Sequence, residues 1–170
     1  MNDKIENFAN RLFAPIGRFV VQFENVCEAL RSGGTRIFAN AGLQKQELAE
    51  LTFAGLTASP LLDVFVSLVS EAFDLTEPQH ETVKDLRKRA QELIAIRNRA
   101  IHSTWYLIDF ADIENGAPDG VLINKRRKQT RLDTRTTSLN RDQLNSLCDD
   151  ATALTNDIRD FVNSLVEPVQ

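Results

Sequence analysis

The sequence predicts an all-α protein: a bundle of four or five helices with a small β-hairpin or loop insert before the last helix. Two patterns predict this fold. Apolar residues recur at three- and four-residue steps over most of the chain, which is typical of helices with one buried side. Strand-like and turn-like segments gather in one interval, about residues 105–137. The 170 residues, 42% of them hydrophobic, are enough for one core, so we expect a single helical domain over residues 1–170.

The first helix is expected over residues 4–31. Pro15 should kink it or split off its first turns, because proline removes one backbone hydrogen bond. Gly33 and Gly34 should end it, and after a loop a short helix is expected over residues 44–53. The apolar side of the first helix is made of Ile5, Phe8, Leu12, Phe19, Phe23, Val26 and Leu30.

Two further helices begin at capping signals. Ser59 followed by Pro60 predicts the start of a helix that runs to about residue 73 and is apolar almost all round, hence central and buried. Thr76 and Gln79 predict a capping box at the start of the longest helix, about residues 77–104.

The insert follows this long helix. Residues 105–110 and 121–125 have the β-branched and aromatic bias of strands, with Asn-Gly and Asp-Gly turn signals between them. The last helix is expected to begin after Asn140, which can form a capping box with Gln143. Its apolar side is made of Leu144, Leu147, Ala151, Leu154, Ile158, Phe161 and Leu165.

Charge is spread unevenly over a chain whose net charge is −4. Residues 1–76 carry −3 and residues 136–170 carry −4, whereas residues 77–135 carry +3. The acidic balance argues against a dedicated duplex-DNA-binding protein, but the central basic excess could still hold a phosphate backbone.

Metal and membrane chemistry are not expected. Cys27 and Cys148 fall inside helical apolar patterns and are expected to be reduced core thiols. With only two histidines and no paired cysteines, we expect no metal and no cofactor. No apolar run reaches the roughly 18 residues of a membrane span, and the first residues lack a signal-peptide pattern. We therefore expect a soluble, cytoplasmic protein.

A polar trio interrupts the long helix near its end. Its apolar stripe would next fall at residue 97, but Arg97 stands there with Asn98 beside it, and His102 follows one turn after Asn98. Burying an arginine or an amide without partners costs several kcal/mol or more, so these side chains should be bonded or line a wet cleft.

Arg97, Asn98 and His102 resemble the signature of the HEPN superfamily, an arginine and an adjacent polar residue with a histidine four to six residues further on. The match covers residues 97–102; the rest agrees only in architecture. The resemblance implies metal-independent cleavage of single-stranded RNA at a homodimer interface, in a toxin or an antiviral effector. His102 would be the general acid and base, Arg97 the phosphate clamp and Asn98 the orienting residue.

Elementary chemistry agrees with these roles. A histidine titrates near neutral pH and can move protons to and from RNA oxygens, and arginine binds phosphate oxygens through two donors. Arg97 and His102 lie about 140° apart around a helix, so a second copy of the chain would be needed to bring them around one cleft. In one branch of the superfamily a tyrosine two residues after the histidine is modified by a partner protein; Thr104 stands there, so that modification is not carried over. Whether a neutralising antitoxin binds this chain stays open.

The same residues admit plainer interpretations. Arg97 and Asn98 could be a structural polar pair, and His102 could interact with the carbonyl end of its helix. Arg99 and the run Lys125, Arg126, Arg127 and Lys128 could be a solvated surface or an RNA-binding track. Trp105 could stack on bases or pack in the core. The alternative function is a non-catalytic helical module that dimerises or binds a partner.

Overall fold

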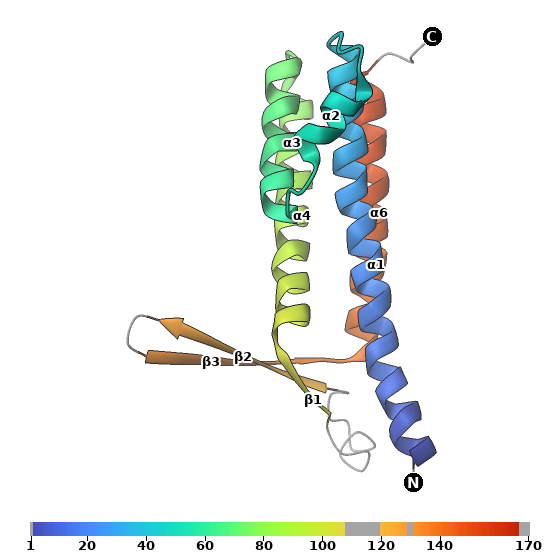
Figure 1. Ribbon diagram of the computed structural model, residues 1–170, viewed down its shortest axis with the longest axis vertical. Helices are drawn as coiled ribbons and strands as arrows, with labels where there is room; N and C mark the ends of the chain where they lie inside the picture. Colours follow the sequence, from blue (N-terminus) through green and yellow to red (C-terminus); the bar gives the residue numbers. More distant parts are fainter. Residues whose placement is uncertain (1, 108–119, 129–130, 167–170) are drawn as a thin grey trace. The chain divides into compact units, whose positions relative to one another are not determined.

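The computed structural model describes residues 2–107, 120–128 and 131–166, and within them the side chains of residues 13–103 and 140–166. The described residues form five helices and one three-stranded antiparallel sheet (Figure 1). The predicted helical bundle is confirmed. Its helices are α1 (Asn2–Asn40), α2 (Gln46–Phe53), α3 (Ala58–Ala72), α4 (Glu77–His102) and α6 (Arg141–Leu165), and its strands are β1 (Thr104–Leu107), β2 (Gly120–Lys128) and β3 (Arg131–Leu139).

The chain divides into two compact units. The first, here called the motif unit, consists of Met1–Val21 and Ala95–Asp149; the second, the core unit, consists of Gln22–Ile94 and Asp150–Gln170. The polar trio and the three strands therefore belong to the motif unit.

Polar side chains on α1 and α6 bond to each other within the core unit. Thr152 donates to Gln22 at 3.4 Å, and Arg36 donates to Asn163 further along both helices, so α1 and α6 run parallel here. The apolar interior of this unit is supplied by every one of its helices. Its side chains less than 2% exposed include Leu30, Ile37, Phe53, Leu61, Val69, Ala90, Leu154 and Ile158.

Helix α3 is buried on one side rather than all round. Leu61 and Phe65 are buried, whereas Asp63 and Ser67 are exposed. The near-continuous apolar run predicted a central helix, but its polar residues fall on one side, and that side faces solvent. The helix also begins one residue before the predicted cap Ser59, at Ala58.

Helix α1 passes straight through Gly33 and Gly34, so the prediction that they end it was wrong. Both glycines are buried. A Cβ on Gly34 would lie 2.3 Å from the Phe53 ring, and one on Gly33 would lie 3.1 Å from Phe65. The two glycines therefore leave bare helix backbone on which aromatic rings from α2 and α3 rest.

Two predicted capping interactions are present. Asn140 and Gln143 form a reciprocal capping box at the start of α6. Gln143 Oε1 accepts the backbone N–H of Asn140 at 2.9 Å, and Asn140 Oδ1 accepts the backbone N–H of Gln143 at 2.8 Å. At the start of α4, the backbone N–H of Thr76 donates to Gln79 Oε1 at 2.8 Å, but the Thr76 hydroxyl donates to the same oxygen. The capping interaction at the start of α4 is thus one half of the predicted capping box.

The insert holds one strand more than the predicted hairpin. Thr104 pairs with Ile123 where β1 meets β2, and β3 continues the sheet by pairing with β2 from Gly120 to Lys128. Residues 131–139 were not predicted to be a strand because they contain only two large apolar residues; threonine's preference for extended backbone is the signal they do carry. Residues 108–110 of the predicted first strand lie outside the described residues.

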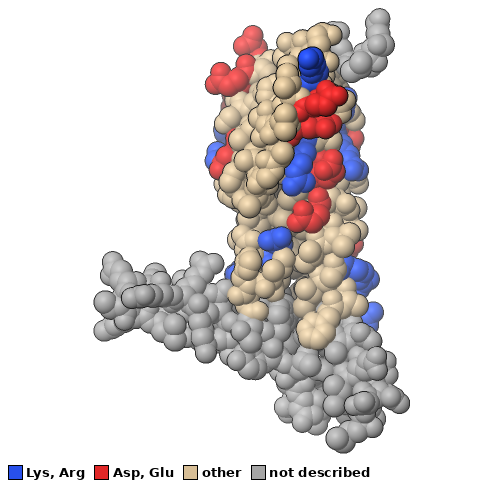
Figure 2. Space-filling model, in the orientation of Figure 1, with Lys and Arg blue, Asp and Glu red and all other residues tan. Residues whose placement is uncertain are grey.

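Charged side chains of both signs are interspersed over the helices on the face shown in Figure 2. Arg89 of α4 binds Asp157 of α6 at 2.7 Å and Asp85 at 3.2 Å. Burial lowers the pKa of Arg89, but these two hydrogen-bonded carboxylates raise it above its ordinary value. None of the helices in the described ranges is both long and apolar enough to cross a membrane.

Candidate functional site

Arg97 occupies the buried side of α4. It follows Ala90 and Leu93, which are 1% and 5% exposed, and it is itself half-buried with its Nε enclosed. Its Nη1 donates to Asn98 Oδ1 at 3.3 Å. The guanidinium therefore lies partly in the apolar seam of the helix and is held by the neighbouring amide.

Asn98 and His102 are both exposed and lie one helical turn apart, about 40° from each other around the axis. Ile101 is beside them and is 41% exposed. Arg99 is also exposed but lies about 100° from Asn98. The last turn of α4 thus presents an imidazole and an amide next to an apolar side chain.

Within one chain the three motif residues do not converge on one point. Arg97 and Asn98 are joined by a hydrogen bond, whereas His102 lies about 140° around the helix from Arg97. An exposed imidazole can exchange a proton with a bound ligand, and a half-buried guanidinium can hold an anion.

The predicted RNA-binding run Lys125–Lys128 lies on β2, and its side chains are outside those described. The sheet register brings in two cations that were not assigned to the site from sequence. Arg131 pairs with Lys128, and Arg135 pairs with Asn124. Both arginines were visible in the sequence, but only strand pairing places them opposite β2.

Neither Cys27 nor Cys148 forms a disulfide bond. Cys27 is buried and Cys148 is half-buried. Burial raises the pKa of the Cys148 thiol and Asp149 acts in the same direction, while Arg18 lowers it. A thiol with a raised pKa is a poor nucleophile near neutral pH. Among the described residues, no group of three or more histidine, cysteine or acidic side chains could hold a metal ion.

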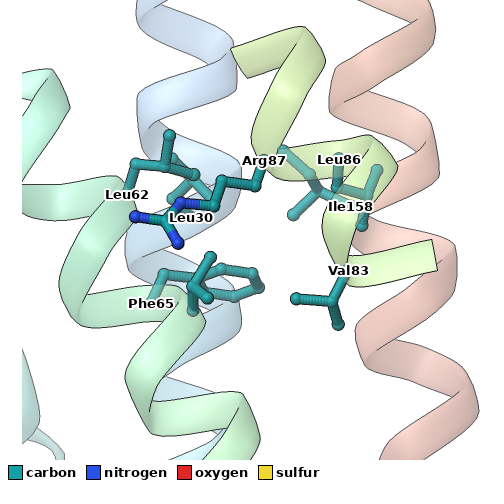
Figure 3. Close-up of a pocket in the computed structure, with 8 residues that line it drawn as sticks. Leu30, Leu62, Phe65, Val83, Leu86, Arg87 and Ile158 are labelled. Atoms are coloured by element: carbon teal, nitrogen blue, oxygen red, sulfur yellow. The ribbon is translucent and has the colours of Figure 1, made fainter. Parts of the chain in front are cut away.

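An apolar pocket of the core unit contains none of the motif residues. It lies among α1, α3, α4 and α6, and Arg87 extends from α4 toward Leu62 and Phe65 (Figure 3). Arg87 also binds Asp63 at 3.0 Å. Its hydrocarbon stem thus covers apolar surface while its charged end reaches a carboxylate, which is a packing role.

Comparisons with known proteins add no relative. No family model, no curated protein and no solved structure matches the chain.

Proposed function

We propose that this protein is a HEPN-like endoribonuclease that cleaves single-stranded RNA without a metal ion and acts as a homodimer. The observation that carries the proposal is the exposed His102–Asn98 pair at the end of α4, beside an Arg97 held half-buried in the apolar stripe. A cell would use such an enzyme as a toxin or a defence effector in its cytoplasm.

The reaction needs two proton transfers and one charge clamp. His102 of one copy takes the proton from an RNA 2′-hydroxyl, whose oxygen then attacks the adjacent phosphorus. The bond from phosphorus to the 5′-oxygen breaks, and the second copy's His102 gives that oxygen a proton. Each transfer contributes roughly 10²–10⁴-fold in rate. Arg97 stabilises the negative charge on the phosphorane, and Asn98 orients the RNA or the ring.

Exposed apolar side chains in the motif unit support the dimer. Ile101 lies between the motif residues, and Phe13 and Val21 are 49% and 60% exposed. Covering Ile101 with a second copy would place two His102 rings near one axis. A protein that stays monomeric at micromolar concentration would contradict this arrangement.

One observation favours the second candidate function, a non-catalytic module that dimerises or binds a partner such as a neutralising antitoxin. The Arg97 guanidinium is bonded to Asn98 within its own chain, as expected if the pair only fixes the helix end. In that case Ile101 would contact a partner and the imidazole would take no part in chemistry.

A cleavage assay decides between the two. Labelled single-stranded RNA is incubated in EDTA with the full chain and with His102→Ala, Arg97→Ala and His80→Ala. His80 is the matched control, because it is exposed on the first turn of the same helix. We expect at least 100-fold slower cleavage for the first two variants and wild-type cleavage for His80→Ala. No cleavage by the wild type, or equal cleavage by His102→Ala, would support the binding module.

A further inference from the structure

We propose that one face of the β2–β3 ribbon docks the RNA backbone, and that the opposite face does not. The docking face, here called the basic face, carries Arg126, Lys128, Arg131 and Arg135. The inference deepens the proposed function and rests on it for the identity of the nucleic acid. The RNA-binding surface is thus defined by strand pairing, instead of by the contiguous run of residues 125–128 that the sequence predicted.

Register assigns the two faces. Residues directly opposite each other in an antiparallel pair share a face, and so do alternate residues along one strand. Lys128 pairs with Arg131, Arg126 with Asp133 and Asn124 with Arg135, so this face carries four cations against one carboxylate.

The other face is less charged. There Lys125 pairs with Thr134 and Arg127 with Leu132, so it carries two cations among neutral residues. The four-residue basic run is therefore divided equally between the faces, and the difference between them comes from the arginines of β3.

The basic part of the ribbon begins where the motif helix ends. Strand β1 starts two residues after His102, and its first residue, Thr104, pairs with Ile123. Residues 124–128 continue β2 beyond that last pair, over about 13 Å at the usual rise of a strand. An RNA strand held along this part would lead toward the end of α4 within the same unit.

The spacing favours a polyphosphate over a folded protein partner. Alternate residues of one strand are about 6.6 Å apart, so Arg126 and Lys128 of β2 are one such step apart, and the two arginines of β3 are two steps apart with Asp133 between them. A nucleic-acid strand carries one negative charge per nucleotide and binds such a row by releasing counterions. The competing occupant is an acidic protein surface, including the core unit of a second copy, which carries 15 acidic and 8 basic residues.

The test compares two double variants with the same loss of charge. Binding of a fluorescein-labelled 20-nucleotide single-stranded RNA is followed by anisotropy from 50 to 250 mM KCl, in the His102→Ala chain so that no RNA is cleaved. Arg126→Ser with Lys128→Ser removes two cations from the basic face. Lys125→Ser with Arg127→Ser removes two from the opposite face of the same strand.

We expect the basic-face pair to weaken binding about ten-fold or more and to reduce the salt slope by about 1.4, the value for two lost phosphate contacts on a single strand. The opposite-face pair should weaken binding about three-fold or less. Arg131→Ser with Arg135→Ser should reproduce the basic-face result from β3, which guards against a folding defect in one double variant. Thermal unfolding of each variant provides the control.

Equal losses from both faces, or no loss from either, would overturn the proposal. It would also be overturned if the basic-face pair left RNA binding intact and abolished self-association in sedimentation. Failure of the nuclease is separable, because face-specific binding by a wild type that does not cleave would contradict catalysis alone.

Discussion

The core unit and the motif unit are filled and charged differently. Among the 90 described side chains of the core unit, 22 are buried and hydrophobic, whereas 3 of the 28 described in the motif unit are. The core unit carries 8 basic and 15 acidic residues, and the motif unit carries 12 basic and 9 acidic residues. Among the described side chains, apolar burial is therefore more frequent in the unit with the acidic excess than in the unit that holds the polar trio.

The strongest contrast is between two phenylalanines. Phe65 of the core unit is 2% exposed and Phe13 of the motif unit is 49% exposed. Phe65→Ala should lower the free energy of unfolding by about 3–5 kcal/mol, through lost burial and an unfilled cavity. Phe13→Ala should change it by less than about 0.5 kcal/mol. Urea unfolding measures both free energies, and similar losses would contradict the difference in burial between the two rings.

Two glycines of α1 should respond with opposite signs. Gly34→Ala drives a methyl group into the Phe53 ring and should lower the free energy of unfolding by about 1–3 kcal/mol. Gly17→Ala meets nothing within 4 Å and should raise it by about 0.5–1 kcal/mol, because alanine favours the helix. The two melting temperatures decide, and a stabilised Gly34→Ala would disprove the close approach.

The cap of α6 is a local stabiliser in the motif unit. Asn140→Ala leaves the backbone N–H of Gln143 without its side-chain acceptor and should cost about 1 kcal/mol in free energy of unfolding. Asn156→Ala is the control, since Asn156 is exposed within the same helix. Thermal unfolding of both variants gives the difference, and an equal response would mean that the box contributes nothing.

The ion pair between α4 and α6 should have the smallest effect. Asp157→Asn removes one of the two carboxylates that Arg89 binds, and both side chains are partly exposed. The expected loss in free energy of unfolding is below about 1 kcal/mol in dilute buffer and close to zero in 1 M salt. Parallel melts at the two salt concentrations check this, and a loss that persists in 1 M salt would contradict a screened pair.

Local signals in the sequence predicted the helices well. Periodicity located α1, α4 and α6, the Ser59-Pro60 signal placed the start of α3 to within one residue, and Asn140 with Gln143 marked the start of α6. The glycine pair was misinterpreted because its partner, Phe53, is 19 residues away in sequence and only packing brings them together. Strand β3 was missed for a related reason: its neighbour β2, rather than its own composition, specifies it.

The candidate site could be predicted residue by residue but not as a surface. The stripe position of Arg97 agrees with its half-buried place in the structure. Helical spacing also indicated that Asn98 and His102 share a side. The pairing of Arg131 with Lys128 depends on the register between β2 and β3. Because no strand was predicted at residues 131–139, this register could not be derived from the sequence.

The packing of Phe53 on the glycine backbone of α1 governs the local stability of α2. Helix α2 has eight residues and no side-chain cap at its start, so it is too short to persist on its own. We expect the amide hydrogens of α2 to be protected from exchange with solvent while its two buried residues, Ala49 and Phe53, stay packed. Because so few buried side chains hold this short helix, we expect it to open and close as one cooperative unit.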